Sequence, residues 1–330
     1  SYSWDNGETT ATASALDAGL HSVTVTDANG ATSSCDITIT QPNILAASAI
    51  QDSPVVCNGE SNGAATVTVT GGNAPYSYAW DNSTSVAASA NDLGAGNHTI
   101  TVTDAKGCSA TATVTINEPE VLAASAIQDS PVVCNGESNG AATVTVTGGN
   151  APYSYSWDNS TSVAASANDL AAGLHTITVT DAKGCSATAT VTINEPEVLT
   201  CNANQDSPVT INGNSDGVAT VTPAGGNGGY TYAWDNGETT ATASALDAGS
   251  HTVTVTDSKG CTSTCNVLIT EPGALFCSVV MDSPVVCNGE SNGVATVTAT
   301  EGVAPYSYSW DNGETTATAS ALDAGLHSVT

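Results

Sequence analysis

The hexapeptide Ala65-Thr66-Val67-Thr68-Val69-Thr70 alternates small or branched apolar residues with threonine. A period of two indicates a β-strand with one buried face, because successive side chains point to opposite sides of a sheet. We therefore expect the valines to point inward and the threonines outward, where the β-branch of threonine suits an exposed pleated surface. The same alternation returns at residues 98–103 and 111–116, and no helical periodicity occurs anywhere in the chain.

A further strand supplies the bulky residues of the predicted core. Tyr76, Tyr78 and Trp80 share one strand face by the same period of two. Glycine- and proline-containing turns flank the strands, and residues 104–107 form a tight hairpin turn. With weaker segments near residues 45–51 and 85–90, we count six or seven strands, which favours an antiparallel two-sheet sandwich of immunoglobulin-like type. The predicted core residues are Tyr78, Trp80, Tyr155, Trp157 and Trp234.

This pattern repeats along the whole chain, with a period of 76 or 77 residues between the five tryptophans and between the five histidines. Residues 1–24 also return letter for letter as residues 307–330, which indicates a larger unit of four modules within a longer array. The predicted tandem modules are residues 1–42 (the C-terminal part of one module), 43–119, 120–196 and 197–272 (three complete modules) and 273–330 (the N-terminal part of another).

The charge of the chain restricts its partners. There are 32 acidic residues, three lysines and no arginine, for a formal net charge of −29. Nucleic acid is excluded as a partner because phosphate neutralisation needs lysine and arginine. The acidity also argues against binding an anionic membrane surface, and no membrane-inserting run occurs in this segment. Divalent cations, cationic partners and simple self-repulsion that keeps a filament soluble remain compatible with it.

Ten cysteines occupy fixed places in the repeat. None shows the paired spacing of a zinc site, so they indicate disulfides and an oxidising compartment. The second and third modules each carry two cysteines. We expect the pairs Cys57–Cys108 and Cys134–Cys185, each tying the start of a module to its last hairpin and stabilising it by roughly 2–4 kcal/mol.

The fourth module departs from this scheme, because Ile211 replaces its first cysteine. Here we expect the pair Cys201–Cys265, and by the same correspondence Cys277 should pair with the counterpart of Cys35 in a following unit. Two cysteines of adjacent modules are then left over, Cys261 and Cys287. They either form an inter-module disulfide that stiffens one joint or remain two free buried thiols.

Bound calcium is the one metal that the composition suggests. Calcium takes six to eight oxygen ligands, and oxygen-bearing side chains are plentiful in the turns. The candidates are Asp52, Asn58, Glu60 and Asn62 near the start of the module and Asp104 and Glu118 at its other end. No calcium-loop motif occurs, so a plain solvated acidic surface is the alternative interpretation.

No motif for catalysis is present. The recurring histidine stands alone on the Val/Ile face of its strand, and no Gly-x-Ser-x-Gly nucleophile turn occurs. The chain is therefore predicted not to be an enzyme and to need no cofactor other than the calcium considered above.

The order of motifs in one module resembles a known family. Cys57-Asn58-Gly59 is followed by Gly-Gly-x-x-Pro-Tyr-x-Tyr-x-Trp, then Val102-Thr103-Asp104-x-x-Gly107-Cys108, and the module ends at Glu118-Pro119. This is similar to the SprB repeats of cell-surface adhesins of gliding Bacteroidota, and the strand motifs also resemble sandwich domains of the polycystic-kidney-disease type. The resemblance implies type IX secretion to the outer surface, with the protein attached to the outer membrane or released, and a role in adhesion or gliding motility.

Three functions follow as hypotheses. The first is an extracellular structural and adhesive filament, a segment of a giant repetitive adhesin whose partners are neighbouring repeats, other copies, and a surface polysaccharide or substratum. The second is an array that binds carbohydrate or protein weakly at each module and gains strength from avidity. The third is the spacer stalk of a secreted enzyme whose catalytic domain lies elsewhere.

Overall fold

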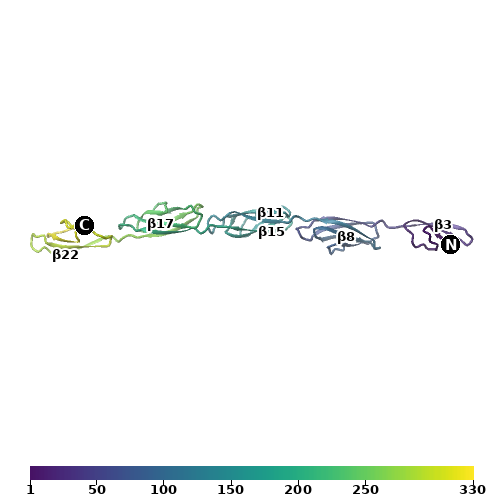
Figure 1. Ribbon diagram of the computed structural model, residues 1–330, viewed down its shortest axis with the longest axis horizontal. Helices are drawn as coiled ribbons and strands as arrows, with labels where there is room; N and C mark the ends of the chain where they lie inside the picture. The colour runs from purple at the N-terminus through teal and green to yellow at the C-terminus, as the bar shows by residue number, and fades with distance from the viewer.

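The computed structural model describes all 330 residues and contains strands and turns but no helix. Figure 1 shows the modules following one another in a single thin row, with the N-terminus at one end and the C-terminus at the other. Every sheet has three strands, and every strand pair is antiparallel. The predicted all-β tandem architecture is therefore confirmed.

Each complete module is a sandwich of two such sheets with six strands in all. In the second module the sheets have the strand orders β4-β5-β7 and β6-β8-β9. Its strands are β4 (Ala46–Ser53), β5 (Gly63–Thr70), β6 (Ser77–Trp80), β7 (Ser89–Leu93), β8 (Gly96–Thr103) and β9 (Ser109–Ile116).

The third and fourth modules repeat this topology strand for strand. The third comprises β10 (Ala123–Ser130), β11 (Gly140–Thr147), β12 (Ser154–Trp157), β13 (Ser166–Leu170), β14 (Gly173–Thr180) and β15 (Ser186–Ile193). The fourth comprises β16 (Thr200–Ser207), β17 (Gly217–Ala224), β18 (Thr231–Trp234), β19 (Thr242–Leu246), β20 (Gly249–Thr256) and β21 (Thr262–Ile269).

The first and fifth modules each contain one sheet. The first has the sheet β1-β2-β3, the counterpart of β6-β8-β9, and the fifth has β22-β23-β24, the counterpart of β4-β5-β7. These strands are β1 (Tyr2–Trp4), β2 (Gly19–Thr26), β3 (Thr32–Ile39), β22 (Phe276–Ser283), β23 (Gly293–Thr300) and β24 (Thr318–Leu322).

Each complete module has its own hydrophobic core between its two sheets. The predicted alternation holds along β5, where Ala65 and Val67 are buried and Thr68 and Thr70 are exposed. The predicted core residues are confirmed: the three tryptophans are at most 6% exposed, and the two tyrosines pack against the core from its edge. The indole N–H of Trp80 donates to the Ala87 carbonyl, so burial leaves no polar group of this ring unpaired.

Candidate functional site: the joint between modules

One half of each joint is the exit loop, which we define as residues 54–62 in the second module, between β4 and β5. Hydrogen bonds tie it to the chain that leaves the module: the Asn58 side-chain amide donates to the Pro119 carbonyl (3.0 Å), and the Gly59 N–H donates to Glu118 Oε2 (2.8 Å). Since Pro119 leads to the next module, these bonds hold Cys57 at the C-terminal end of its own sandwich.

The other half is the incoming hairpin of the following module, residues 181–185 between β14 and β15. The buried Asp181 carboxylate organises it, accepting from the N–H groups of Asn150 (2.8 Å), Lys183 (2.8 Å) and Cys185 (2.9 Å). Burial by itself would raise the pKa of Asp181, but these donors outweigh burial and lower it. The carboxylate is therefore ionised and fixes the turn that presents Cys185.

A disulfide joins the two halves. Cys57 is bonded to Cys185, and Cys134 is bonded in the same way to Cys261, with the Cα atoms 5.6 Å apart in both pairs. A hydrogen bond lies beside the second disulfide, where the Asn227 amide donates to the Val133 carbonyl (3.0 Å). The equivalent Asn150 amide donates to the Val56 carbonyl (3.5 Å), so the second–third and third–fourth joints are both covalent and hydrogen-bonded.

This arrangement corrects the predicted pairs Cys57–Cys108 and Cys134–Cys185. Strand β4 carries the chain from the linker to the far end of the module, so Cys57 and Cys108 lie at opposite ends of one sandwich. The predicted pair Cys261–Cys287 is wrong for the same reason, and Cys261 is bonded to Cys134 instead.

The pair Cys201–Cys265 is confirmed. It links β16 to β21 across the two sheets of the fourth module, with the Cα atoms 6.0 Å apart. Four cysteines are free and exposed in this chain: Cys35, Cys108, Cys277 and Cys287. The pairing of Cys277 with a counterpart of Cys35 stays a prediction.

Glycine determines how closely the linker approaches the next module. Gly148 has a φ of +69°, and a Cβ added there would overlap the backbone carbonyl oxygen of Val121 in the linker. The next residue, Gly149, donates its N–H to the Glu120 carbonyl (2.9 Å). The Gly-Gly pair therefore accepts both the left-handed backbone and the close contact that a side chain would prevent.

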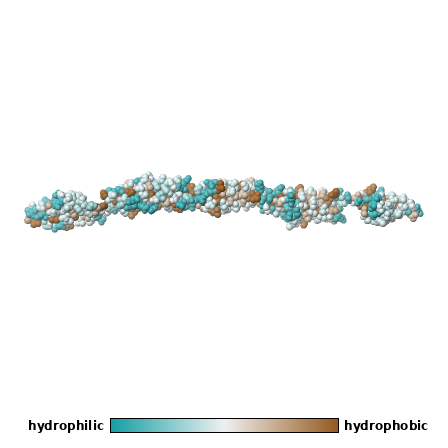
Figure 2. Space-filling view, in the orientation of Figure 1, coloured by the Kyte–Doolittle hydropathy of each residue, from teal (hydrophilic) through white to brown (hydrophobic).

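The joint between the fourth and fifth modules is built differently. Ile211 stands where the other exit loops have cysteine, and Val303 stands where Asn227 makes its bond across the previous joint. Glu301, with a φ of +64°, replaces the first glycine of the Gly-Gly pair, and Gly273 on the linker leaves room for its side chain. Figure 2 shows apolar residues close to the narrow necks that separate the end modules from the middle three.

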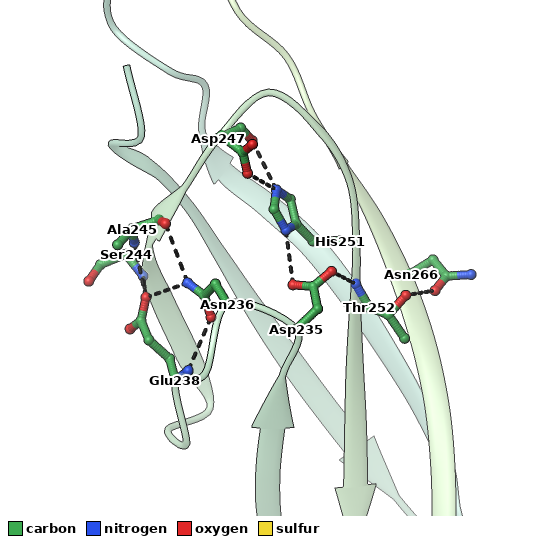
Figure 3. Close-up of polar contacts among 9 residues, drawn as sticks. All are labelled: Asp235, Asn236, Glu238, Ser244, Ala245, Asp247, His251, Thr252 and Asn266. Atoms are coloured by element: carbon green, nitrogen blue, oxygen red, sulfur yellow. Dashed lines mark hydrogen bonds and ion pairs between the residues drawn. The ribbon is translucent and has the colours of Figure 1, made fainter. Parts of the chain in front are cut away.

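A histidine–aspartate pair lies at one end of each β-sheet that contains the recurring histidine. In Figure 3, His251 lies between two acidic residues: its Nδ1 is 3.0 Å from Asp235 Oδ1, and its Nε2 is 3.0 Å from the Asp247 carbonyl oxygen and 3.1 Å from Asp247 Oδ1. The other Asp235 oxygen accepts from the Thr252 N–H (2.9 Å). Burial alone would lower the pKa of His251, but the hydrogen bonds to Asp235 and Asp247 outweigh burial and raise it.

Both ring nitrogens of His251 thus face acceptors, and only the doubly protonated ring can donate to both. Such a ring is not free to remove a proton from a nucleophile. The arrangement is that of a structural clamp, which ties the turn before β20 to the end of β18.

The acidic residues considered for calcium do not cluster in this structure. Each binds a separate donor of the protein: Asp52 accepts from the Thr66 hydroxyl (2.7 Å), and Glu60 accepts from the Asn62 amide (2.7 Å). Asp104 and Glu118 hold the hairpin and the exit loop. Nowhere do three or more His, Cys, Asp or Glu side chains gather in a metal-binding arrangement, so the expected clustering of these ligands is not observed.

Comparison with known proteins places these modules in a family. The model of the SprB repeat matches four segments, residues 50–85, 127–162, 203–239 and 283–315. The chain contains four SprB repeat segments. Each matched segment begins within the strand that leads into the exit loop and runs past the core tryptophan.

Solved structures similar to this chain are also tandem modules. They include the N-terminal eight Ig domains of Down Syndrome Cell Adhesion Molecule (12% identity, TM-score 0.28), of which the chain spans 50% while 95% of the chain is covered. A tetra-tandem repeat from the extending region of a large adhesion protein is 14% identical (TM-score 0.26, 87% of this chain and 88% of that one). The I-band fragment I67-I69 of titin is 15% identical (TM-score 0.29, 70% and 99%). No curated protein sequence matches the chain.

The sequence carried one signal of the inter-module bond that the predicted pairing within modules overlooked. The exit-loop cysteine is lost at Ile211, and the hairpin cysteine is lost at Ala31, which lies in a module whose residues 1–24 are identical to residues 307–330 of the fifth. Ile211 lies in the fourth module, so a repeat of the four-module unit would put the two losses in neighbouring modules, as expected for partners across a joint. The structure has no helix long and apolar enough to span a membrane.

Proposed function

We propose that this array of SprB repeats is the stalk of an extracellular adhesive filament, which holds an adhesive element at a distance from the surface that bears it. The covalent joint carries the proposal, because a bond between consecutive modules at two successive joints serves a load-bearing rod and has no use in catalysis. We further propose, on the family resemblance, that the filament belongs to a giant cell-surface adhesin that is exported by the type IX route and used in attachment or gliding.

The location of the disulfides supports a mechanical role. Cys57–Cys185 and Cys134–Cys261 close loops of 128 and 127 residues, and the loops overlap between residues 134 and 185. Tension applied to the ends of the chain passes through these bonds, so unfolding of one module cannot release its whole length. Such bonds persist in oxidising, extracellular surroundings, in keeping with an exported protein.

The chemistry of the histidine clamp supports a role other than catalysis. The ring nitrogens of His251 are engaged by acceptors, and the same is true of His21, His175 and His327. The acidic surface keeps long rods apart through mutual repulsion and so keeps them soluble. We propose neighbouring modules, other copies and a polysaccharide or solid substratum as the partners.

Single-molecule stretching of the full chain tests the mechanical function. In the oxidised chain, the segment from Cys57 to Cys261 should extend along its shortest path, through both disulfides and the 51 residues between Cys134 and Cys185. Reduction should lengthen this path from 51 residues to the full 204 residues between Cys57 and Cys261, a gain of about 520 Å at ~3.4 Å per residue. An equal contour length before and after reduction would contradict the load-bearing role, and strong glycan binding by the unstretched chain would favour the binding-array alternative.

A further inference from the structure

The fourth–fifth joint lacks the two bonds that connect the module faces at the joints before it. At the second–third and third–fourth joints, a disulfide joins the exit loop to the next module, and an asparagine amide donates to an exit-loop carbonyl, that of Val56 or Val133. At the fourth–fifth joint, Ile211 occupies the exit-loop cysteine position and Val303 occupies the asparagine position. A hydrocarbon side chain forms no disulfide and donates no hydrogen bond, so both bonds are lost together.

The linker of this joint also differs in sequence. The linkers of the two bonded joints contain Glu120-Val121 and Glu197-Val198, and the fourth–fifth linker contains Gly273-Ala274 at the same place. Glycine has the widest choice of backbone conformations, and alanine lacks the β-branch that stiffens valine. The fourth–fifth linker is therefore less constrained by its own residues than the other two linkers are.

The contact between the linker and the following module is looser as well. At the bonded joints, a Cβ on Gly148 or Gly225 would lie 2.0 or 2.1 Å from a linker carbonyl oxygen, so the linker backbone passes directly against these glycines. Glu301 stands at this position in the fifth module and has a Cβ of its own, at a φ of +64°. The linker cannot approach Glu301 as closely, and the backbone contact that fixes the direction of the other linkers is missing here.

The linker nevertheless stays attached to both modules. On the side of the fourth module, the Asn212 side-chain amide donates to the Pro272 carbonyl (3.0 Å). On the side of the fifth module, the Gly302 N–H donates to the Gly273 carbonyl (2.9 Å). Because the two attachments are one residue apart on the linker, a rotation between the modules is confined to the few backbone bonds around Gly273.

We propose that the fourth–fifth joint is a hinge, about which the array bends while the second, third and fourth modules move as one rigid segment. The two bonded joints are fixed both at the module faces and through the linker, whereas the fourth–fifth joint is fixed through the linker alone. Hinges in proteins are a few loop residues, often small, that absorb the change in backbone angles. Gly273 and Ala274 are the residues that fill this role.

A hinge between rigid segments suits a stalk. A rod that is locked at every joint passes a sideways force to its attachment as leverage, whereas a rod with one free joint turns into the direction of the force. Axial tension still passes along the chain through the linker. The inference deepens the proposed stalk function and rests on it for the use of the hinge.

Pulsed electron paramagnetic resonance on the full chain tests the hinge. Spin labels are attached through unnatural amino acids, which leaves every cysteine in place. Val163, Thr239 and Thr315 are suitable sites, because they are exposed and occupy equivalent positions in the third, fourth and fifth modules.

In the oxidised chain, labels at Val163 and Thr239 span a bonded joint and should give a narrow distance distribution. Labels at Thr239 and Thr315 span the proposed hinge and should give a broad one. A label pair within the fifth module, at Glu290 and Thr315, should again give a narrow distribution, because the breadth arises at the joint and not inside the module. Reduction should broaden the first distribution and leave the second unchanged.

A variant of the third–fourth joint provides the matched comparison. Cys134→Ser and Cys261→Ser together with Asn227→Val remove the same two face bonds that the fourth–fifth joint lacks, and the distribution across the third–fourth joint should then become broad. Equal widths across the two joints of the oxidised parent chain, or a distribution that stays narrow in the triple variant, would overturn the proposal. A rigid fourth–fifth joint would leave the stretching result unaffected, because that result depends on the disulfide loops of the other two joints.

Discussion

Cys57 is bonded to Cys185 of the following module, while Cys108 in its own module carries a free thiol. The covalent unit of this array is therefore the joint, to which one module contributes the exit loop and the next contributes the hairpin. Replacing either cysteine leaves the other without a partner. Ile211 and Ala31 each occupy a position that is cysteine at the bonded joints.

Loss of one joint disulfide should loosen one joint and leave the sandwiches folded. Cys57→Ser should reduce the free energy of unfolding by about 2–4 kcal/mol, because it opens a loop of 128 residues. It should also broaden the distribution of particle shapes in small-angle X-ray scattering. Cys108→Ser removes a free thiol and serves as the control. Equal effects of the two substitutions would mean that the bond lies within the module after all.

Trypsin should distinguish the three hairpins. The only cleavage sites are Lys106, Lys183 and Lys259, and the last two precede a bonded cysteine, whereas Lys106 precedes a free one. In the oxidised monomer, we expect cleavage at Lys106 first, since its turn is held by no neighbour. Reduction should bring the rate at Lys183 up to that at Lys106, because the local sequences are identical. Mass spectrometry of timed digests measures this, and equal rates before reduction would refute it.

Local patterns in the sequence predicted most of the fold. The alternation around Val67 places each side chain on a face without reference to the rest of the molecule, so strands and core were predictable. The cysteine pairs were not, since they depend on which end of the sandwich each loop reaches. The path of β4, which separates Cys57 from Cys108 by the length of the module, determines which end of the sandwich Cys57 reaches.

The histidine clamp shows a second limit of the sequence. The recurrence of His251 was evident, but its acceptors are Asp235, 16 residues earlier, and a backbone carbonyl. Residue types alone do not predict the conformation of this turn or the direction in which a backbone carbonyl points. The hydrogen bonds of Asp52 to Thr66 and of Glu60 to Asn62 were equally hard to foresee from the sequence.

The His251 clamp should make the fourth module less stable at alkaline pH. The folded-state pKa of His251 is raised above its ordinary value of 6.5. Its contribution is therefore fully present below pH 6.5 and is lost as the pH rises through the folded value. We expect the melting temperature to fall over this range, and Asp247→Asn, which removes the second carboxylate, should weaken the dependence. A melting temperature of the Asp247→Asn variant that follows pH as the parent does would contradict this role.

Replacing the glycine at the linker contact, Gly148, should destabilise the fold more than replacing the hairpin glycine Gly184. Gly148 and Gly184 both have positive φ, but a Cβ at Gly184 would meet nothing within 4 Å. Gly184→Ala should therefore show only backbone strain, of about 1–2 kcal/mol. Gly148→Ala adds a clash with the Val121 carbonyl and should cost more and displace the linker. Chemical denaturation gives the two costs, and equal values would show that the linker contact is unimportant.

The hairpin of the fourth module, residues 257–261, should keep its structure in acid until the Asp257 carboxylate is protonated. Burial alone would raise the pKa of Asp257, but four hydrogen bonds outweigh it: the N–H groups of Asn227, Lys259 and Cys261 and the Asn227 side-chain amide all donate to the carboxylate, and the pKa falls to about 2.

A group with a depressed pKa stabilises the fold above its ordinary value, here 3.8, and this stabilisation is lost as the pH falls through the folded value. Hydrogen exchange at the amides of Lys259 and Cys261 should therefore remain protected at pH 4 and lose protection towards pH 2, after correction for the intrinsic rate. Asp257→Asn should remove this protection even at neutral pH, because a neutral amide is a weaker acceptor for these donors. Glu197→Gln changes the charge equally at an exposed side chain and should leave the exchange unchanged. Protection that persists in Asp257→Asn would show that the turn is held by the Cys134–Cys261 bond alone.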